Sequence, residues 1–253
     1  TLALTSIIVT VALNRGPMPD RILPLPDPEP EAPEAVAKGD DPQRAAVAAE
    51  LLEPQLTRDL AAKGLEFGDP IFVRIFKEER LLELWVRPRD EGTYRLFRSY
   101  PVAGMSGHPG PKLAEGDLQA PEGFYFVPRG RMNPNSKYHL SFDLGYPNAY
   151  DTAHQRTGSA LMVHGNRLSA GCYAMTDAKI EEIYTLCDAA LQHGQPFFRV
   201  HCFPFRMGAE RMLEAVEHQW FPFWQNLREG YDLFEENRVP PNATVQGQRY
   251  QFD

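Results

Sequence analysis

The pattern of apolar and polar positions between residues 70 and 203 is typical of short β-strands. Two apolar runs, residues 71–76 and 81–86, flank the polar segment Lys77-Glu-Glu-Arg80 and predict a hairpin. Further strands, separated by joints rich in Gly and Pro, are predicted at residues 94–102, 123–127, 137–144, 160–164 and 197–203. The centre of the chain is therefore predicted to be mainly β.

Helical periodicity is confined to three other regions. Residues 42–63 begin with a proline and end before a glycine, as helices commonly do. Residues 176–193, opened by a Thr-Asp capping pair, predict a second helix. Residues 208–237 favour helix, and their aromatic side chains are expected to pack on the sheet, with a peptide-binding aromatic groove as the alternative. The predicted fold class is thus mainly β with α (α+β), a sheet sandwich or barrel with a helical C-terminal cap.

These patterns divide the chain into five parts. Residues 1–13 are apolar but shorter than the ~20 residues of a membrane span. They fit a signal peptide or signal anchor, with a first strand or helix as the alternative, so export and possible anchoring are expected. A Pro-rich linker is predicted over residues 14–40. An N-terminal helical segment (41–66), a main domain (67–205) and a helical C-terminal extension (206–253) follow.

Charge and cysteine content narrow the function classes. The 253 residues carry 26 Lys and Arg against 34 Asp and Glu and show no basic stripe, which argues against nucleic-acid binding. No Cys-x-x-Cys or His-x-x-x-His pair occurs, so no metal and no other cofactor is expected. Three cysteines leave at least one free thiol. Cys187 and Cys202 are expected either as buried apolar residues or as a disulfide.

Candidate chemistry concentrates in residues 161–175, Leu-Met-Val-His-Gly-Asn-Arg-Leu-Ser-Ala-Gly-Cys-Tyr-Ala-Met. A thiol nucleophile needs a base beside it and donors for a developing oxyanion. Cys172 is the candidate nucleophile and His164 the candidate general base, at a predicted strand-to-helix junction. A helix N-terminus and a nearby imidazole are expected to lower the pKa of such a thiol. Taken singly, each residue is more often structural, so the prediction depends on their combination.

This segment resembles the L,D-transpeptidase (YkuD-domain) family, whose signature is His-Gly followed by Ser/Thr-x-Gly-Cys. The similarity is greatest to the YafK-type branch, through Met162-Val-His-Gly165 and the run Ser-Ala-Gly-Cys-Tyr-Ala-Met-Thr-Asp at 169–177. It extends over roughly residues 65–240. Most family members have Ser-His-Gly-Cys-Ile-Arg, whereas this chain has Ala170 and Ala174 in place of the His and the Arg, as that branch does.

The resemblance implies an exported murein enzyme of the periplasm, with residues 67–205 as its catalytic domain. Family enzymes attack the L-centre carbonyl of meso-diaminopimelate in peptidoglycan stem peptides, form a thioester and pass it to an amine or to water. The YafK-type branch is associated with hydrolysis of the bond between murein and a covalently attached lipoprotein, which is the favoured function. The alternatives are a synthetic transpeptidase that makes cross-links or attaches protein, and a non-catalytic murein-binding regulator.

Supporting roles are predicted for other residues. By the same resemblance, Ser169 or the backbone of Gly165 would orient His164. Backbone N–H groups would form an oxyanion hole at Ala170, Gly171 and Cys172. Substrate contacts are predicted for Tyr146, Tyr150, Tyr173 and Arg206. The Arg would pair with a carboxylate, and a structural ion pair is its alternative. The weaker candidates are His108 and Lys112.

Overall fold

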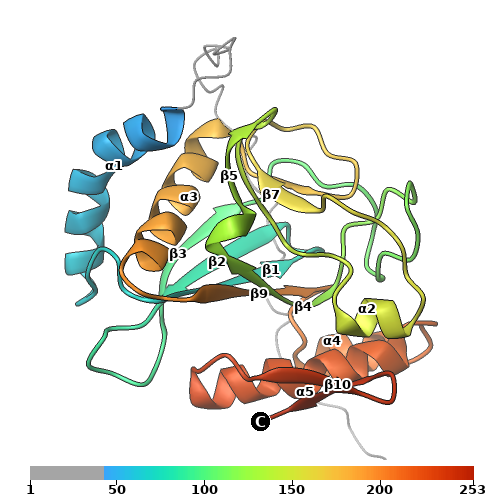
Figure 1. Cartoon of the computed structure of the whole chain (residues 1–253). Helices are drawn as coiled ribbons and strands as arrows, with labels where there is room; N and C mark the ends of the chain where they lie inside the picture. The colour runs from blue at the N-terminus through green and yellow to red at the C-terminus, as the bar shows by residue number, and fades with distance from the viewer. Residues whose placement is uncertain (1–42) are drawn as a thin grey trace, which may run out of the picture. The chain divides into compact units, whose positions relative to one another are not determined.

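The computed structural model describes residues 43–253, which form two main β-sheets, a two-stranded hairpin and covering helices (Figure 1). The predicted signal segment and linker lie outside the described residues. One sheet has five strands in the order β3-β2-β1-β9-β4. These strands are β1 (Ile71–Phe76), β2 (Leu81–Val86), β3 (Arg95–Pro101), β4 (Gly123–Pro128) and β9 (Phe197–Phe203).

The second sheet has four strands in the order β5-β6-β7-β8. They are β5 (Met132–Ser136), which follows the 3-10 turn η1 (Arg129–Arg131), then β6 (His139–Asp143), β7 (Met162–His164) and β8 (Tyr173–Ala174). Helix α3 (Asp177–Gln192) begins three residues after β8 and contacts β6 and β7. Helix α1 (Arg44–Ala61) lies beside α3 (Figure 1).

Strand β1 shows how the five-stranded sheet is buried on both faces. All six of its residues are buried. Ile71, Val73 and Ile75 belong to the main core, whereas Phe72 and Phe76 belong to aromatic clusters on the opposite face. This division follows from the alternation of side chains along a strand. The strand is therefore an apolar run interrupted only by the buried Arg74, as expected for a strand covered on both faces.

The C-terminal segment covers that opposite face (Figure 1). It consists of α4 (Ala209–Glu214), α5 (Phe221–Asn237), and the hairpin of β10 (Ala243–Gln246) and β11 (Arg249–Phe252). Phe223 and Trp224 of α5 are buried in one cluster with Phe76 and Phe203 of the sheet. The packing of these aromatic side chains on the sheet is confirmed. The hairpin follows the helices and was not predicted for the helical C-terminal extension of residues 206–253.

The mixed α+β fold class is confirmed, as is the hairpin at residues 71–86. Helix α3 forms as predicted, but Thr176 makes no capping hydrogen bond, and its hydroxyl is buried without a partner. Cys187 and Cys202 are buried free thiols. Within residues 43–253, no helix combines the length and apolar character that a membrane crossing requires.

Candidate active site

Strands β7 and β8 place His164 and Cys172 on the same face of the four-stranded sheet. The strands are parallel, with His164 opposite Ala174. Cys172 is two residues before Ala174, so it lies level with Met162 and its side chain shares the face of His164. The N–H of Met162 is 3.4 Å from the Cys172 Sγ, in agreement with this register. Cys172 directly precedes β8, so the register puts the thiol and the imidazole on the same sheet face, offset by two residues along neighbouring segments.

The backbone fixes the tautomer of His164. Its Nδ1 lies 2.5 Å from the carbonyl oxygen of Gly165, and because a carbonyl only accepts, Nδ1 carries the proton. Nε2 then presents a lone pair, the form that a general base needs. The ring also stacks on Tyr138, with 4.6 Å between centroids. Of the two expected orienting groups, the Gly165 carbonyl makes the contact, while the Ser169 hydroxyl donates to the Cys172 carbonyl oxygen at 2.6 Å.

Burial moves the two pKa values in opposite directions. His164 is 1% exposed, and burial lowers the pKa of its imidazole, opposed by the Gly165 carbonyl and the Asp177 carboxylate. Burial also raises the pKa of the Cys172 thiol, and the nearby Asp143 carboxylate adds to this rise. The Met162 N–H and the Lys112 ammonium act in the opposite direction and lower the thiol pKa. The expectation of a lowered thiol pKa is therefore wrong, because desolvation outweighs the other influences. Both groups rest in their neutral forms.

The turn before Cys172 is held by the loop of residues 104–122. Gly171 has φ +97°, a backbone conformation that favours glycine. Its N–H donates to the Ser106 Oγ at 2.7 Å, and a Cβ here would lie 3.1 Å from the Gln119 carbonyl oxygen. Of the three predicted oxyanion donors, Gly171 thus has a protein acceptor. The N–H groups of Ala170 and Cys172 have none among the described residues.

The first residue of α3 supports the turn after His164. Asp177 Oδ1 accepts the N–H of Asn166 at 2.7 Å. The same oxygen lies 2.5 Å from where a Cβ of Gly165 would be, so only glycine fits there. Sequence reasoning placed Asp177 at the helix start but missed its contact with the His164 turn. Its position in the 169–177 run was the available signal.

Tyr146 and Lys112 lie together near the thiol. The Tyr146 hydroxyl donates to the Lys112 carbonyl oxygen at 3.1 Å, and the Lys112 ammonium donates to Asp117 at 2.6 Å. Gly158 lets the Lys112 side chain lie close to the backbone, because a Cβ added at this glycine would be 2.6 Å from the Lys112 Cε. Ala160 follows Gly158 by two residues in the chain, and its carbonyl oxygen is 3.6 Å from the Cys172 Sγ. Tyr146 is 5% exposed and belongs to the main core, so it is linked to this neighbourhood only through its bond to Lys112.

Two other predicted substrate contacts are packing residues. Tyr173 has no exposed surface, and its hydroxyl donates to the Pro121 carbonyl oxygen at 2.7 Å. Tyr150 is buried beneath the C-terminal segment, where it stacks on Tyr250 with ring centroids 4.3 Å apart. The tyrosine in the residue after Cys172 points to the opposite sheet face, as the strand alternation requires. These placements correct the expected roles of both side chains.

Arg206 forms a structural ion pair, which was the alternative to the predicted contact with a substrate carboxylate. Its guanidinium is 2.5 Å from the Glu83 carboxylate and lies over the Phe76 ring. Its backbone N–H donates to Glu79 at 2.8 Å. None of these groups contacts the thiol. His108, a weaker candidate, lies in the loop of residues 104–122, where its backbone N–H donates to the Gln119 side chain at 2.9 Å.

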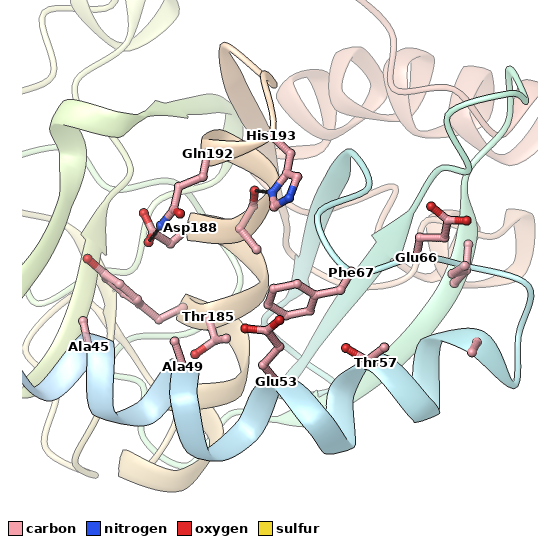
Figure 2. Close-up of a pocket in the computed structure, with 14 residues that line it drawn as sticks. Ala45, Ala49, Glu53, Thr57, Glu66, Phe67, Thr185, Asp188, Gln192 and His193 are labelled. Atoms are coloured by element: carbon pink, nitrogen blue, oxygen red, sulfur yellow. Dashed lines mark hydrogen bonds between the residues drawn. The ribbon is translucent and has the colours of Figure 1, made fainter.

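A separate groove lies between α1 and α3 (Figure 2). It has a volume of about 530 Å³ and is lined by residues that include Ala49, Glu53, Thr185 and His193. Its lining residues make no hydrogen bond or ring contact with His164 or Cys172, so the groove is not part of this site. Within the described part of the chain, no three His, Cys, Asp or Glu side chains are grouped to hold a metal ion.

A half-buried thiol beside a neutral imidazole, with free backbone N–H groups next to it, is the arrangement of enzymes that use cysteine for acyl transfer. The model of the YkuD family, the L,D-transpeptidase catalytic domain, matches residues 71–201, and the chain belongs to this family. It is an enzyme family that acts on peptidoglycan.

The candidate L,D-transpeptidases YafK of Escherichia coli strains K12 and O157:H7 are each 44% identical over 183 residues, covering 72% of this chain and 74% of theirs.

Two solved structures are also similar. The helical cell shape determining protein Pgp2 of Campylobacter jejuni is 21% identical with a TM-score of 0.44, over 66% of this chain and 56% of that one. Bd1075 of Bdellovibrio bacteriovorus is 18% identical with a TM-score of 0.38, over 73% of this chain and 83% of that one. This chain thus spans little more than half of the Pgp2 chain.

Proposed function

We propose that this protein is a cysteine-dependent murein hydrolase that releases covalently attached lipoprotein in the periplasm. Its substrate would be a peptidoglycan stem peptide in which the L-centre carbonyl of meso-diaminopimelate is linked to the lipoprotein. Membership of the L,D-transpeptidase family supports the peptidoglycan substrate. The 44% identity to YafK supports assignment to that branch of the family.

In the proposed mechanism, His164 Nε2 removes the Sγ proton as Cys172 attacks the carbonyl carbon. The N–H groups of Ala170 and Cys172 stabilise the oxyanion of the tetrahedral intermediate. The imidazolium then returns its proton to the leaving amine, which departs as the C–N bond breaks and a thioester remains. Water, deprotonated by the same imidazole, attacks the thioester. The products are a carboxylate and the regenerated thiol.

One observation favours water over a second peptide as the acceptor. Ala174 shares the sheet face of Cys172 and is fully buried. Gly104 pairs with it, and a Cβ on Gly104 would be 3.4 Å from the Ala174 Cβ. Position 174 is therefore enclosed and carries no arginine, unlike most family members. Without that cation, one group fewer is available beside Cys172 to hold the carboxylate of an acceptor stem peptide, whereas water needs none.

The test is incubation of the purified protein with lipoprotein-linked murein fragments, followed by mass spectrometry. Hydrolysis yields free lipoprotein and a stem peptide whose last residue is diaminopimelate with a free L-centre carboxylate, and a trapped thioester on Cys172 accompanies turnover. New peptide dimers would instead identify a synthetic transpeptidase. Turnover by the Cys172→Ala variant would refute the mechanism, and no product that depends on Cys172 would leave the regulator alternative.

A further inference from the structure

The loop of residues 104–122 contacts the residues on both sides of Cys172. Before the cysteine, the Gly171 N–H donates to Ser106 at 2.7 Å. After it, the buried Tyr173 hydroxyl donates to the Pro121 carbonyl oxygen at 2.7 Å. The position of the Cys172 backbone therefore depends on where this loop lies.

A buried ion pair closes the loop. The side chains of Lys77 and Glu122 are both 0% exposed, and Lys77 Nζ is 3.0 Å from Glu122 Oε1. The ammonium also donates to the carbonyl oxygens of Gly110 at 2.7 Å and Ala120 at 2.9 Å, so its three donors are all used. Glu122 Oε1 in turn accepts the Gly110 N–H at 2.6 Å. The middle and the end of the loop are thus tied to one carboxylate.

The other oxygen of that carboxylate is held by the C-terminal segment. Trp224 Nε1 of α5 donates to Glu122 Oε2 at 2.9 Å, and the indole is 1% exposed. Phe205 and His218 pack against the indole, with ring centroids 5.1 and 4.4 Å away. Trp224 lies beyond residues 71–201, the part that the family model matches. A donor from outside the family domain therefore completes the anchor of the loop beside the thiol.

We propose that Trp224 is a positioning residue of the enzyme, which holds the Cys172 backbone through Glu122 and the loop of residues 104–122. A buried carboxylate that loses a donor cannot replace it with bulk water, so it shifts toward other partners. Here the groups that would follow such a shift are Lys77 and Gly110, and with them the loop. The inference rests on the proposed role of Cys172, and it makes the C-terminal segment part of the active enzyme.

The test compares Trp224→Phe with Trp85→Phe in the full chain. Trp85 is the matched control, because its buried Nε1 also donates to a carboxylate in an ion pair, Glu83 at 3.0 Å, away from the loop. Two quantities are measured: kcat and KM on murein peptides, and the rate of Cys172 alkylation by iodoacetamide. We expect Trp224→Phe to lower kcat about tenfold with little change in KM, and to change the alkylation rate severalfold. Trp85→Phe should leave both within about twofold.

Alkylation needs no substrate, so it tests the positioning role even if the proposed hydrolysis fails. Equal alkylation rates and equal kcat in Trp224→Phe, Trp85→Phe and the unsubstituted protein would overturn the proposal, whatever happens to the melting temperature. Trp224→Tyr keeps a donor on an aromatic ring, so part of the kcat and part of the normal alkylation rate should return in it. If Trp224→Phe does not fold, Ser106→Ala takes its place, because it removes the contact of the loop with the Gly171 N–H. A Cys172 alkylation rate in Ser106→Ala that matches Trp85→Phe would then overturn the proposal.

Discussion

At the scale of single residues, burial acts on the proposed nucleophile and base together. It raises the pKa of the Cys172 thiol and lowers the pKa of the His164 imidazole, so both directions favour the uncharged pair. A pre-formed thiolate–imidazolium pair would require the reverse. Proton transfer to Nε2 therefore belongs to the attack itself, which makes the orientation of the imidazole by the Gly165 carbonyl important to the rate.

This pairing of neutral groups predicts how Cys172 alkylation depends on pH. Since thiolate is the reactive form, the rate in the folded protein should be below that of the unfolded chain at pH 7 and should still rise above pH 9. Iodoacetamide labelling read by peptide mass spectrometry gives the rate at Cys172 alone. The buried Cys187 and Cys202 serve as internal controls that react only on unfolding. A plateau of the Cys172 rate below pH 7 would contradict the neutral pair.

The Asp177 carboxylate provides a second prediction. It raises the pKa of His164 and accepts the Asn166 N–H, so Asp177→Asn should lower the imidazole pKa further. The acidic limb of the pH–rate profile should move to lower pH, and kcat near pH 7 should fall because the base is weaker. Loss of a carboxylate from the first turn of α3 should also reduce the free energy of unfolding by about 0.3–1 kcal/mol.

Asp188→Asn is the control for Asp177→Asn, because Asp188 lies on the same helix and lines the groove beside α1. Its pH–rate profile should match that of the unsubstituted protein. An unchanged acidic limb in Asp177→Asn would mean that the carboxylate acts on the helix alone.

At the scale of elements, the sequence predicted the strands and helices whose own pattern of apolar and polar residues is strong. The runs 71–76 and 81–86 became β1 and β2, and the helix after the cysteine became α3. Strand β8 was missed because it has two residues, Tyr173 and Ala174, and exists through pairing with β7 and Gly104. Strand β5 contains Asn and Pro, which local propensity disfavours. Such elements are set by their partners rather than by their composition.

The same distinction applies to the candidate site. His164, Gly165 and Cys172 were predictable because one short segment holds all three. Ser106 and Asp143 reach this segment from elsewhere in the chain, through a loop and through β6. No local pattern marks them, because their roles arise from the sheet register and the packing of the loop. The substrate contacts predicted for Tyr150 and Tyr173 were wrong for this reason as well.

Glycine at the turn before Cys172 can be tested directly. Gly171→Ala should reduce the free energy of unfolding by about 1–2 kcal/mol, because an L-residue at φ +97° is strained and its Cβ would press on the Gln119 carbonyl. The strain is relieved by moving the turn, so kcat should fall as well. Thermal unfolding and turnover of the same preparation measure the two effects.

Gly130→Ala is the matched control, since Gly130 has no positive φ and no atom within 4 Å of its Cβ position. It should change the free energy of unfolding by less than about 0.5 kcal/mol and leave turnover unchanged. If Gly171→Ala behaved in the same way, the close approach of the loop to Cys172 would not be needed for activity.

At the scale of the whole molecule, a network of ion pairs joins the C-terminal segment to the five-stranded sheet. Arg74 of β1 pairs with Glu83 of β2 at 2.9 Å and with Glu235 of α5 at 2.6 Å. Arg206 adds a second cation to Glu83 at 2.5 Å. Arg74 and Glu83 are its buried members, and removing either one leaves the other charge short of a partner, so the sheet and the segment depend on each other.

This network predicts a dependence of stability on pH. Burial would raise the pKa of Glu83, but Arg74 and Arg206 outweigh it, and the pKa is lowered. A carboxylate with a lowered pKa stabilises the fold above its unfolded value near 4.3 and loses that contribution as the pH falls through its folded value. Replacing Arg206 by Met keeps the packing over Phe76 but brings the Glu83 pKa closer to its ordinary value.

The free energy of unfolding of Arg206→Met, measured by urea denaturation from pH 7 to pH 3, should be lower than that of the unsubstituted protein above pH 5. The difference should be no more than about 1 kcal/mol, because the Arg206 guanidinium is 43% exposed and therefore screened. It should shrink as Glu83 becomes protonated, and KM on murein peptides should stay unchanged. A raised KM with unaltered stability would instead place Arg206 in the substrate site, because only a contact with the substrate carboxylate would then account for the loss.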